Sequence, residues 1–413
     1  MSIYTQLLER EKANNPIRVG VIGAGQMGFG MIAQIASIPG MVVAGISDIN
    51  MENALKAKKA FDEKATLPYD VFLSTNFKDV VNHPNVEVLV DATGVPEVGA
   101  KLALACLMAK KHLVLLNVEI DITVGPLLHK LFSAAGLMYT GSDGDEPAST
   151  FELYEFAKTM GFEVLVLGKG KNNKLRPEAN PTSVGDEARE RNMSAHMLAS
   201  FADGTKTMAE MTLLSNATGY VADVTGMHGT KGHLEETVAQ LRLKSEGGVL
   251  DKYGVVEYVD GLAPGVFAII KAQSTGVADT MNYMMKVDRD HHILYRPYHL
   301  ASLETPVTIA RALLNKQAAI TPIGQISDTV AVAKKDIKAG ERLDGIGGYC
   351  VRGVIESHQV TKEKQYIPIG LIAGNCVAKR DIPNGTFVTL DDVSLDITTT
   401  VWKLRQLQEE LLG

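Results

Sequence analysis

The residues IRVGVIGAGQMG (17–28) predict how the first part of this chain folds. Its apolar half predicts a buried strand, and its glycines have G-x-G-x-x-G spacing at the start of a predicted helix. In such a turn the first glycine allows a tight bend, the second lets a pyrophosphate approach the backbone, and the third lets helix pack on strand. The helix N-terminus then favours the negative charge of a dinucleotide. The predicted cofactor residues here are Gly23, Gly25, Gln26, Met27 and Gly28.

Further apolar runs alternate with amphipathic helices, which predicts a doubly wound α/β domain with a parallel sheet buried on both faces. The expected strands are residues 17–23, 41–47, 86–94, 112–117 and 137–141. Asp48, after the second run, is placed to bind a ribose hydroxyl of NAD. Lys56, Lys58 or Lys59 could instead accept the 2′-phosphate of NADP, although a solvated helix face explains these lysines better.

Later strand ends of this sheet are expected beside the nicotinamide, because ligands bind outside the carboxyl ends of parallel strands. Thr93 and Gly94, in the stretch DATG, follow one strand, and Asn117 and Glu119 follow the next. The sequence therefore predicts a Rossmann domain that binds NAD or NADP.

Composition limits the class of protein. The chain has 413 residues, of which 46% are hydrophobic and 22% charged, a profile typical of a globular protein with two or three domains. The formal net charge of -7 argues against nucleic-acid binding. Three scattered cysteines and the lack of a long apolar run or signal peptide predict a cytoplasmic protein with no membrane contact. We expect a small-molecule substrate and a homo-oligomer, either a dimer or a tetramer.

The fold class predicted is α/β, with an N-terminal Rossmann domain, an α+β catalytic domain and a small β-rich C-terminal domain. The expected domain limits are 1–145, 146–325 and 326–413. The middle domain is expected to contain an antiparallel sheet of residues 266–273, 283–287 and 293–298, and helices at 186–200 and 204–217. The last domain repeats the pattern Lys-x-Asp-Ile-x-x-Gly at 334–340 and 379–385, and the chain ends in a helix.

Five motifs carry a family resemblance. They are NVEIDITVGPLL (117–128), SDGDEPAS (142–149), GKGKNN (168–173), DGTKTMAEM (203–211) and LYRPYHL (294–300). With these motifs the chain resembles the 1-deoxy-D-xylulose 5-phosphate reductoisomerase-like family, which is built on the homoserine dehydrogenase plan and has a C-terminal SAF domain. The repeated Lys-x-Asp-Ile-x-x-Gly unit is similar to SAF domains. The resemblance implies reduction and rearrangement of a sugar phosphate in isoprenoid biosynthesis, although relatives act on other small sugar-derived substrates.

Two polar clusters are candidates for catalysis in the middle domain. Lys169, Lys171, Asn172 and Asn173 are expected in a loop after an apolar strand, where they could hold a phosphate or carboxylate and polarise a carbonyl. Asp203 and Lys206 are expected on one face at the start of a helix. Because the similar helix of homoserine dehydrogenases carries an acid and a lysine, Lys206 is the first choice for the general acid/base, with Asp203 tuning it. A helix cap and a solvated lysine would explain the pair equally well.

The acidic residues Asp143, Asp145 and Glu146 could bind Mg²⁺ or Mn²⁺, as the resemblance implies, or could simply begin a helix. Arg296 could bind a phosphate or pair with a carboxylate.

The function predicted is hydride transfer between NAD(P) and a small hydroxy-carbonyl compound, phosphorylated or not, with reductoisomerase-like activity as the most specific expectation. The alternatives are a simple dehydrogenase of a hydroxy acid or a homoserine-like alcohol, and a regulatory protein that senses NAD(P) without turnover.

Overall fold

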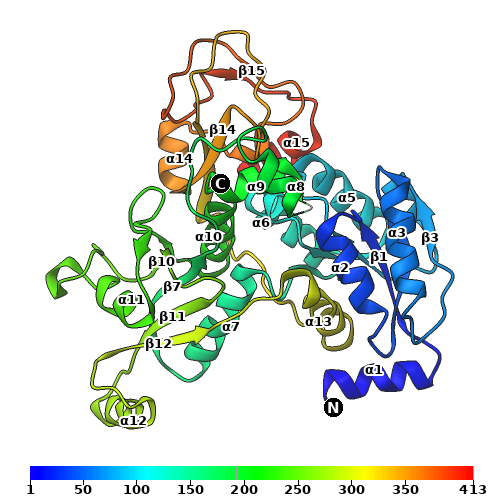
Figure 1. The fold of residues 1–413 in the computed structure, drawn as a ribbon, viewed down its shortest axis with the longest axis horizontal. Helices are drawn as coiled ribbons and strands as arrows, with labels where there is room; N and C mark the ends of the chain where they lie inside the picture. The colour runs from blue at the N-terminus through cyan, green and yellow to red at the C-terminus, as the bar shows by residue number, and fades with distance from the viewer. Residues whose placement is uncertain (192, 413) are drawn as a thin grey trace. The chain divides into compact units, whose positions relative to one another are not determined.

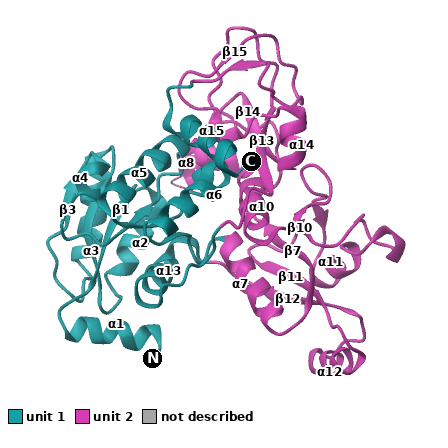
Figure 2. Ribbon diagram, turned by 180° about the vertical axis from the view of Figure 1, so that it is seen from behind, with its two compact units in different colours: residues 1–145, 300–321, 397–413 teal, residues 146–299, 322–396 magenta. Residues whose placement is uncertain are grey.

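The computed structural model describes residues 1–191 and 193–412, which form two compact units (Figures 1 and 2). Unit 1 comprises residues 1–145, 300–321 and 397–413, and unit 2 comprises residues 146–299 and 322–396. The contacts therefore group two later segments with the N-terminal domain and keep most of the expected second and third domains together. The limits 1–145, 146–325 and 326–413 stay a prediction.

Unit 1 is built on a six-stranded sheet in which every neighbouring pair of strands is parallel. In sheet order the strands are β3 (Phe72–Ser74), β2 (Met41–Ser47), β1 (Ile17–Ile22), β4 (Val88–Asp91), β5 (His112–Leu115) and β6 (Tyr139–Gly141). This order reverses between β1 and β4, which is the doubly wound topology of dinucleotide-binding folds. The predicted Rossmann domain is confirmed, and only the short edge strand β3, which is incompletely buried, had no matching prediction.

The helices of unit 1 connect these strands or pack beside the helices that do. They are α1 (Ile3–Lys12), α2 (Gln26–Ile35), α3 (Met51–Asp62), α4 (Phe77–Val81), α5 (Pro96–Ala109), α6 (Val118–Ala134), α13 (Thr305–Ala310) and α15 (Thr400–Leu412). The C-terminal helix α15 packs on α5 and α6, where Glu97 accepts hydrogen bonds from the backbone N–H groups of Thr400 and Val401. Among the described residues, no helix is both long enough and apolar enough to cross a membrane.

Unit 2 contains a mixed sheet in the order β12-β11-β7-β10-β8, with β9 beside β10. Its strands are β7 (Glu163–Lys171), β8 (Val221–Ala222), β9 (Thr230–Lys231), β10 (Val255–Asp260), β11 (Val266–Lys271) and β12 (His291–Arg296). Strands β7 and β10 run parallel, whereas β11 is antiparallel to β7 and to β12. Its first helices are α7 (Glu146–Thr159), α8 (Gly185–Glu190), α9 (Ala195–Ala202), α10 (Thr205–Thr218) and α11 (Leu234–Gln240).

Two predicted elements of unit 2 are wrong. Residues 283–287 were expected as a strand, but α12 (Thr275–Met285) covers most of them, begun by the Ser274 side chain, which accepts from Val277 N. The apolar run there is not a core strand, because Tyr283 and Met284 are exposed. The single helix expected at 186–200 is interrupted between α8 and α9.

The repeated Lys-x-Asp-Ile-x-x-Gly segments pair with each other. Backbone hydrogen bonds join Ile337 and Ile382 in both directions at 2.9 and 2.8 Å. Asp336 accepts from Asn384 N, and Asp381 accepts from Ala339 N, each at 2.9 Å. The two copies are therefore related by an approximate twofold arrangement. The other elements of this region are β13 (Ser327–Ala333), β14 (Val351–Ser357), α14 (His358–Lys364), β15 (Val377–Ala378) and β16 (Val393–Ser394).

Candidate functional site

Each of the three motif glycines has the surroundings that its expected role requires. Gly23 has a φ of +95°, and a Cβ on Gly28 would lie 1.9 Å from the Gly23 carbonyl oxygen, so β1 and α2 approach too closely for a side chain. A Cβ on Gly25 would instead meet no atom within 4 Å. The space over Gly25 is thus open, as a backbone that receives a pyrophosphate needs.

The N-terminus of α2 is free to meet negative charge. No side chain caps this helix at Gly25, and Gln26 and Met27 are exposed on its first turn. Asp48, at the end of β2, lies next to the glycine turn, because its Oδ2 accepts from Ala24 N at 2.8 Å. The open cradle, the uncapped helix and the adjacent acid fit a nicotinamide dinucleotide.

Gly25→Ala and Gly28→Ala are expected to have different effects. Gly25 has a φ of -66°, which alanine adopts, so Gly25→Ala should keep the melting temperature while weakening NADH affinity at least ~10-fold by filling the cradle. Gly28→Ala should lower the free energy of unfolding by about 1–3 kcal/mol, because its methyl group clashes with backbone. Fluorescence titration with NADH and urea unfolding measure the two effects. Equal NADH affinity in Gly25→Ala and the unmodified protein would contradict this assignment.

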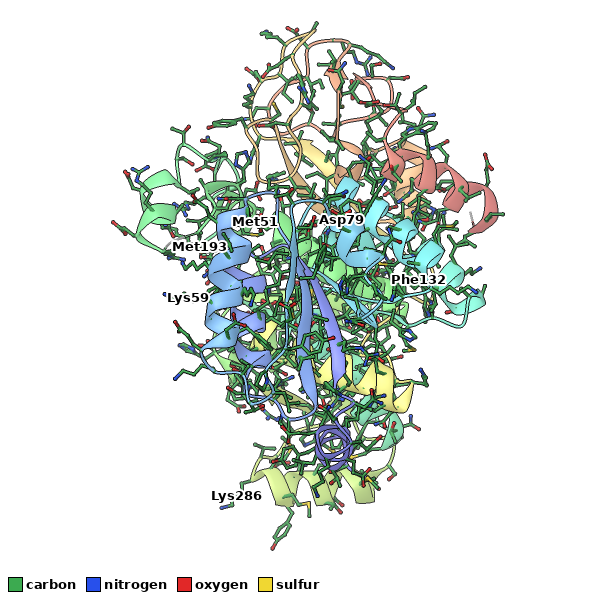
Figure 3. The ribbon with its side chains drawn as sticks, turned by 90° about the vertical axis from the view of Figure 1, so that its right-hand side faces the viewer. Met51, Lys59, Asp79, Phe132, Met193 and Lys286 are labelled. Atoms are coloured by element: carbon green, nitrogen blue, oxygen red, sulfur yellow. The ribbon has the colours of Figure 1, made fainter. Side chains whose placement is uncertain are left out.

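The lysines on α3 have other partners nearby. Lys58 pairs with Asp62 at 2.7 Å, and Lys59, which points to solvent in Figure 3, lies 3.9 Å from Glu63. Lys56 lies over the ring of Phe29, 5.3 Å from its centroid. These contacts match the solvated helix face that explained the lysines best, and the choice between NAD and NADP stays open.

A buried hydrogen-bonded group forms where β4 and β5 end. Asp91 Oδ1 accepts from the backbone N–H and the hydroxyl of Thr93, and Asp91 Oδ2 accepts from Asn117 Nδ2 at 2.9 Å. Asn117 also caps α6 by accepting from Ile120 N. Burial raises the pKa of Asp91 to about 6. The group holds Thr93 and Asn117 at the sheet edge where we expect the nicotinamide, and Gly94 turns the chain there with a φ of +63°.

Two further carboxylates are buried in the first turns of α6. Glu119, a predicted site residue, is 3% exposed, and its charge contributes to the raised pKa of Asp91. Asp121 is 2% exposed, and burial raises its pKa to about 7. Asp91 and Asp121 were not predicted, although both lie within or beside motifs of the sequence.

Asp121→Asn is expected to remove a pH dependence of stability. Because the pKa of Asp121 is about 7 in the folded protein, against 3.8 for an aspartate in water, folding favours its protonated form. The free energy of unfolding should therefore fall as pH rises from about 4 to about 7, by up to about 4 kcal/mol. Asp121→Asn should lose that part of the slope and be more stable at pH 8. Urea unfolding across this range measures both proteins, and parallel pH profiles would contradict the prediction.

The centre of unit 2 is a lysine held between two glutamates. Lys169 is 3% exposed, and its Nζ donates to Glu146 Oε1 at 2.6 Å and to Glu210 Oε2. Burial lowers the pKa of Lys169, but the two carboxylates outweigh it and the net pKa is raised, so the ammonium stays charged. Burial and Glu146 raise the pKa of Glu210. Lys169 was expected in a loop, but it lies inside β7, which extends further than its apolar run.

Lys171 also lies on β7 rather than in a loop. Its Nζ donates to the carbonyl oxygen of Phe201 at 3.3 Å, and burial, with the charge of Lys169, lowers its pKa. The two asparagines that follow differ: Asn172 lies 3.5 Å from His299, and Asn173 accepts from Arg191 at 3.3 Å. The structure thus brings Lys169, Lys171 and Asn172 toward one region. Asn173 instead binds Arg191, which forms an ion pair with Glu187.

Asp203 and Lys206, the predicted acid/base pair, differ in burial and in their partners. Asp203 is fully buried between α9 and α10, where its carboxylate accepts from Lys334 Nζ at 2.8 Å and from Thr205 N at 2.9 Å. Lys206 is partly exposed on α10, and its charge lowers the pKa of Glu210, which is four residues along the same helix. That Asp203 tunes Lys206 stays a prediction. The sequence analysis did not identify Glu210 as a partner of Lys206, although their i, i+4 spacing on one helix indicates it.

His299 and Arg296 border this region. His299 Nε2 lies 3.4 Å from Glu146 Oε1. Arg296 donates to Ser149 at 3.1 Å, lies 3.4 Å from Glu152, and stacks over Tyr298. Of the two alternatives for Arg296, its contacts match a carboxylate partner.

Two of the three expected metal ligands, Asp145 and Glu146, have carboxylate oxygens that lie within 4.8 Å of each other and of Glu210, a grouping that could hold a metal ion. Asp143 is not part of this group. Asp143 pairs with Arg311 at 3.0 Å and accepts from Thr308, whereas Glu146 pairs with Lys169. Asp143 and Glu146 thus have cationic partners, and the binding of Mg²⁺ or Mn²⁺ by these acidic residues stays a prediction.

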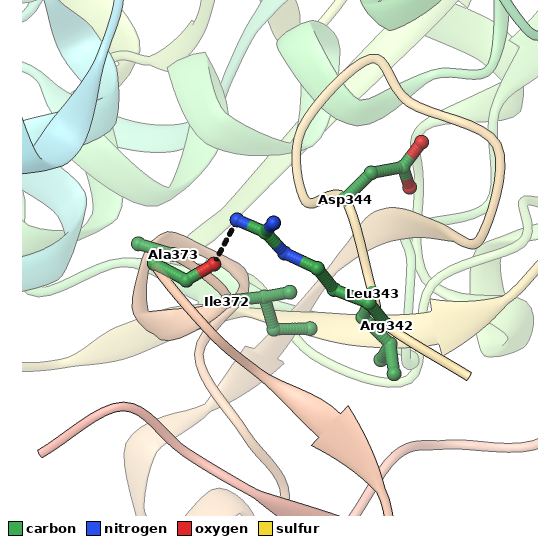
Figure 4. A pocket seen from close by; sticks show the side chains of 6 residues that line it. Arg342, Leu343, Asp344, Ile372 and Ala373 are labelled. Atoms are coloured by element: carbon green, nitrogen blue, oxygen red, sulfur yellow. Dashed lines mark hydrogen bonds between the residues drawn. The ribbon is translucent and has the colours of Figure 1, made fainter. Parts of the chain in front are cut away.

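A separate pocket of about 380 Å³ lies in the C-terminal part of unit 2 (Figure 4). Its two charged side chains are bound to main chain: Arg342 donates to Gly374 O at 2.6 Å, and Asp344 accepts from Tyr349 N at 2.6 Å. These contacts leave it without a buried polar group directed at a ligand.

Three family models match successive parts of the chain. Residues 17–115 match "Oxidoreductase family, NAD-binding Rossmann fold", residues 144–305 match "Oxidoreductase DRL, catalytic domain", and residues 328–394 match "SAF domain". A comparison with curated proteins found no match. The models support the predicted oxidoreductase and SAF domain, but they do not single out the deoxyxylulose phosphate reaction or a homoserine dehydrogenase.

Solved structures with a similar fold include oxidoreductases. A probable dehydrogenase from Thermotoga maritima is 16% identical with a TM-score of 0.44, covering 73% of this chain and 90% of its own. Scyllo-inositol dehydrogenase from Lactobacillus casei, solved with NAD(H) and scyllo-inositol, is 12% identical with a TM-score of 0.42 and the same coverage. Biliverdin reductase from Synechocystis sp. PCC 6803 is 18% identical with a TM-score of 0.30, covering 45% of this chain and 57% of its own.

The glycine cradle of unit 1 and the three family models lead to one conclusion. The chain combines an NAD-binding Rossmann domain with a DRL-type catalytic segment and a SAF domain, and it is an NAD(P)-dependent oxidoreductase.

Proposed function

We propose that the protein transfers a hydride between NAD(P) and a carbon of a small, sugar-derived hydroxy-carbonyl compound. A side chain of unit 2 donates or accepts the proton that accompanies this transfer. The observation that carries the proposal is the buried Lys169 held between Glu146 and Glu210. A permanently charged ammonium in a region of low dielectric constant can stabilise the negative oxygen that forms during carbonyl reduction.

The proton requires a different group. Lys169 is a poor donor because its pKa is raised, so it serves as an electrostatic group. Lys206, which is partly exposed and whose charge lowers the pKa of Glu210, is the proposed general acid/base. In the reducing direction Lys206 gives its proton to the carbonyl oxygen as the carbon receives hydride, and a hydroxyl group results. The nicotinamide cofactor supplies that hydride when it is bound.

The most specific form of the proposal is reduction coupled to a 1,2-shift of the carbon skeleton, as in 1-deoxy-D-xylulose 5-phosphate reductoisomerase. The five sequence motifs of the resemblance support it. A simple dehydrogenase of a hydroxy acid or homoserine-like alcohol would use the same Lys169 and Lys206 without the shift. A sensor of NAD(P) would need neither lysine for turnover, and the buried charge cluster therefore favours an enzyme.

The experiment that separates these forms is a substrate screen followed by nicotinamide absorbance. Purified protein is tested with NADH and NADPH against deoxyxylulose phosphate, and with NAD⁺ and NADP⁺ against homoserine and a panel of sugar acids, with and without Mg²⁺ or Mn²⁺. Turnover of deoxyxylulose phosphate would support the reductoisomerase form. A requirement for Mg²⁺ or Mn²⁺ in this turnover would support the predicted metal site. Turnover of an unphosphorylated sugar acid or of homoserine alone would support the simple dehydrogenase. No turnover of any compound, with tight cofactor binding, would favour the sensor.

A further inference from the structure

Among the described residues of unit 2, Lys171 and Arg352 are buried or partly buried cations without an ion pair. The first is Lys171, which is 6% exposed at the end of β7. Within the described residues its Nζ has one hydrogen bond, a 3.3 Å contact to the main-chain oxygen of Phe201. A charge that is buried this far with one neutral partner is costly to the folded protein, so the arrangement calls for a function.

The second cation is Arg352, on strand β14 of the SAF segment. Its side chain is partly buried, and in residues 1–191 and 193–412 its guanidinium has neither a hydrogen bond nor an ion pair. The next residue, Gly353, donates from its backbone N–H to Thr205 Oγ1 at 2.8 Å, which holds β14 against the first turn of α10 (Figure 2). The SAF segment thus presents an arginine beside the helix that carries Lys206.

The carboxylates near the two cations have other cationic partners. Asp203 interacts electrostatically with both Lys171 and Arg352, but it pairs with Lys334 at 2.8 Å. Glu210 and Asp260 also interact with Lys171, but Glu210 pairs with Lys169 and Asp260 lies 3.9 Å from Lys231. In the register of β7 and β10, Tyr258 is opposite Lys169 and Asp260 is opposite Lys171. Tyr258 is 8% exposed and interacts with Arg352. Its hydroxyl has no hydrogen-bond partner among the described side chains and backbone, and can donate.

We infer that Lys171 and Arg352, with the Tyr258 hydroxyl, form a subsite for an oxyanion group of the substrate, either a phosphate or a carboxylate. The SAF segment therefore contributes an anchoring residue to the substrate, and Lys169 and Lys206 lie next to the reacting oxygen. The planar guanidinium provides paired N–H donors that match such an anion, and the lysine provides a point charge. This inference rests on the proposed function for its substrate, but the binding it describes requires no turnover.

The test measures anion binding to the full-length protein by calorimetry, with inorganic phosphate and D-glycerate as separate probes and no cofactor. The unmodified protein should bind at least one of them, and the probe that binds identifies the anion class. Arg352→Gln and Lys171→Met should each weaken that binding at least ~10-fold. Arg342→Gln is the matched control, because Arg342 is another arginine of the same SAF segment and donates to Gly374 O. Its anion affinity should equal that of the unmodified protein.

Stability provides a second measurement that separates a binding role from a structural one. Lys171→Met removes a poorly paired buried charge, so its melting temperature without anion should stay the same or rise by about 2 °C. Arg352→Lys should recover part of the lost affinity, because charge returns without the paired donors. The inference is overturned if the unmodified protein binds neither probe, or if Arg352→Gln and Lys171→Met bind as tightly as Arg342→Gln. Anion binding without any hydride transfer would instead overturn the proposed function alone.

Discussion

Lys169→Met is expected to lower the free energy of unfolding by about 3–5 kcal/mol, because it leaves Glu146 and Glu210 buried without their cation. Both carboxylates are at most 5% exposed, so water cannot replace the lost ammonium. Urea unfolding at pH 8 measures the loss. The deficit should shrink as pH falls, because the uncompensated carboxyl groups of the variant take up protons more readily than those of the unmodified protein.

Two further variants make this expectation specific. Adding Glu146→Gln and Glu210→Gln to Lys169→Met removes the stranded charges and should restore a large part of the lost stability. Lys174→Met, which changes an exposed lysine of the following loop, should change the free energy of unfolding by less than about 0.5 kcal/mol. A Lys169→Met protein as stable as Lys174→Met would show that the cluster is not the charged core described above.

Lys206→Met is expected to reduce turnover by about 10²–10⁴-fold while NADH affinity stays unchanged. Turnover falls because the proposed proton donor is absent, and affinity is kept because the expected cofactor contacts lie in unit 1. Stopped-flow absorbance of the nicotinamide and fluorescence titration measure the two quantities on one preparation.

The control for this variant is Lys231→Met, since the Lys231 side chain is 82% exposed in the same unit. It should keep full activity. If Lys206→Met retained turnover within about threefold of Lys231→Met, Lys206 would not be the acid/base, and Lys171, whose pKa is lowered, would become the first candidate.

Local patterns in the sequence predicted the cofactor half of the site. The roles of Gly23, Gly25 and Gly28 follow from their spacing after an apolar strand, because a strand, a tight turn and a helix are formed by contiguous residues. The buried strands of unit 1 were also predictable from local sequence. A short, continuous apolar run between two helices is typical of a parallel strand that is covered on both faces.

The catalytic half was predicted less well because its contacts join distant segments. Lys169 was identified, but its partners come from α7 and α10, so their pairing depends on packing that no local pattern encodes. Asp203 was assigned to a neighbour three residues away, whereas Lys334 reaches it from the SAF segment. The end of β7 was placed too early because Lys169 and Lys171 look like loop residues, yet their charges are buried with the strand.

Isotope transfer from the cofactor shows whether hydride reaches a carbon of the substrate. The protein is incubated with nicotinamide cofactor deuterated at the reactive C4 position and with the substrate found in the screen, and the product is analysed by mass spectrometry. We expect deuterium to be transferred to a carbon of the product, and we expect Lys206→Met to lose this transfer. Cofactor oxidation with no deuterium in the product would contradict this expectation.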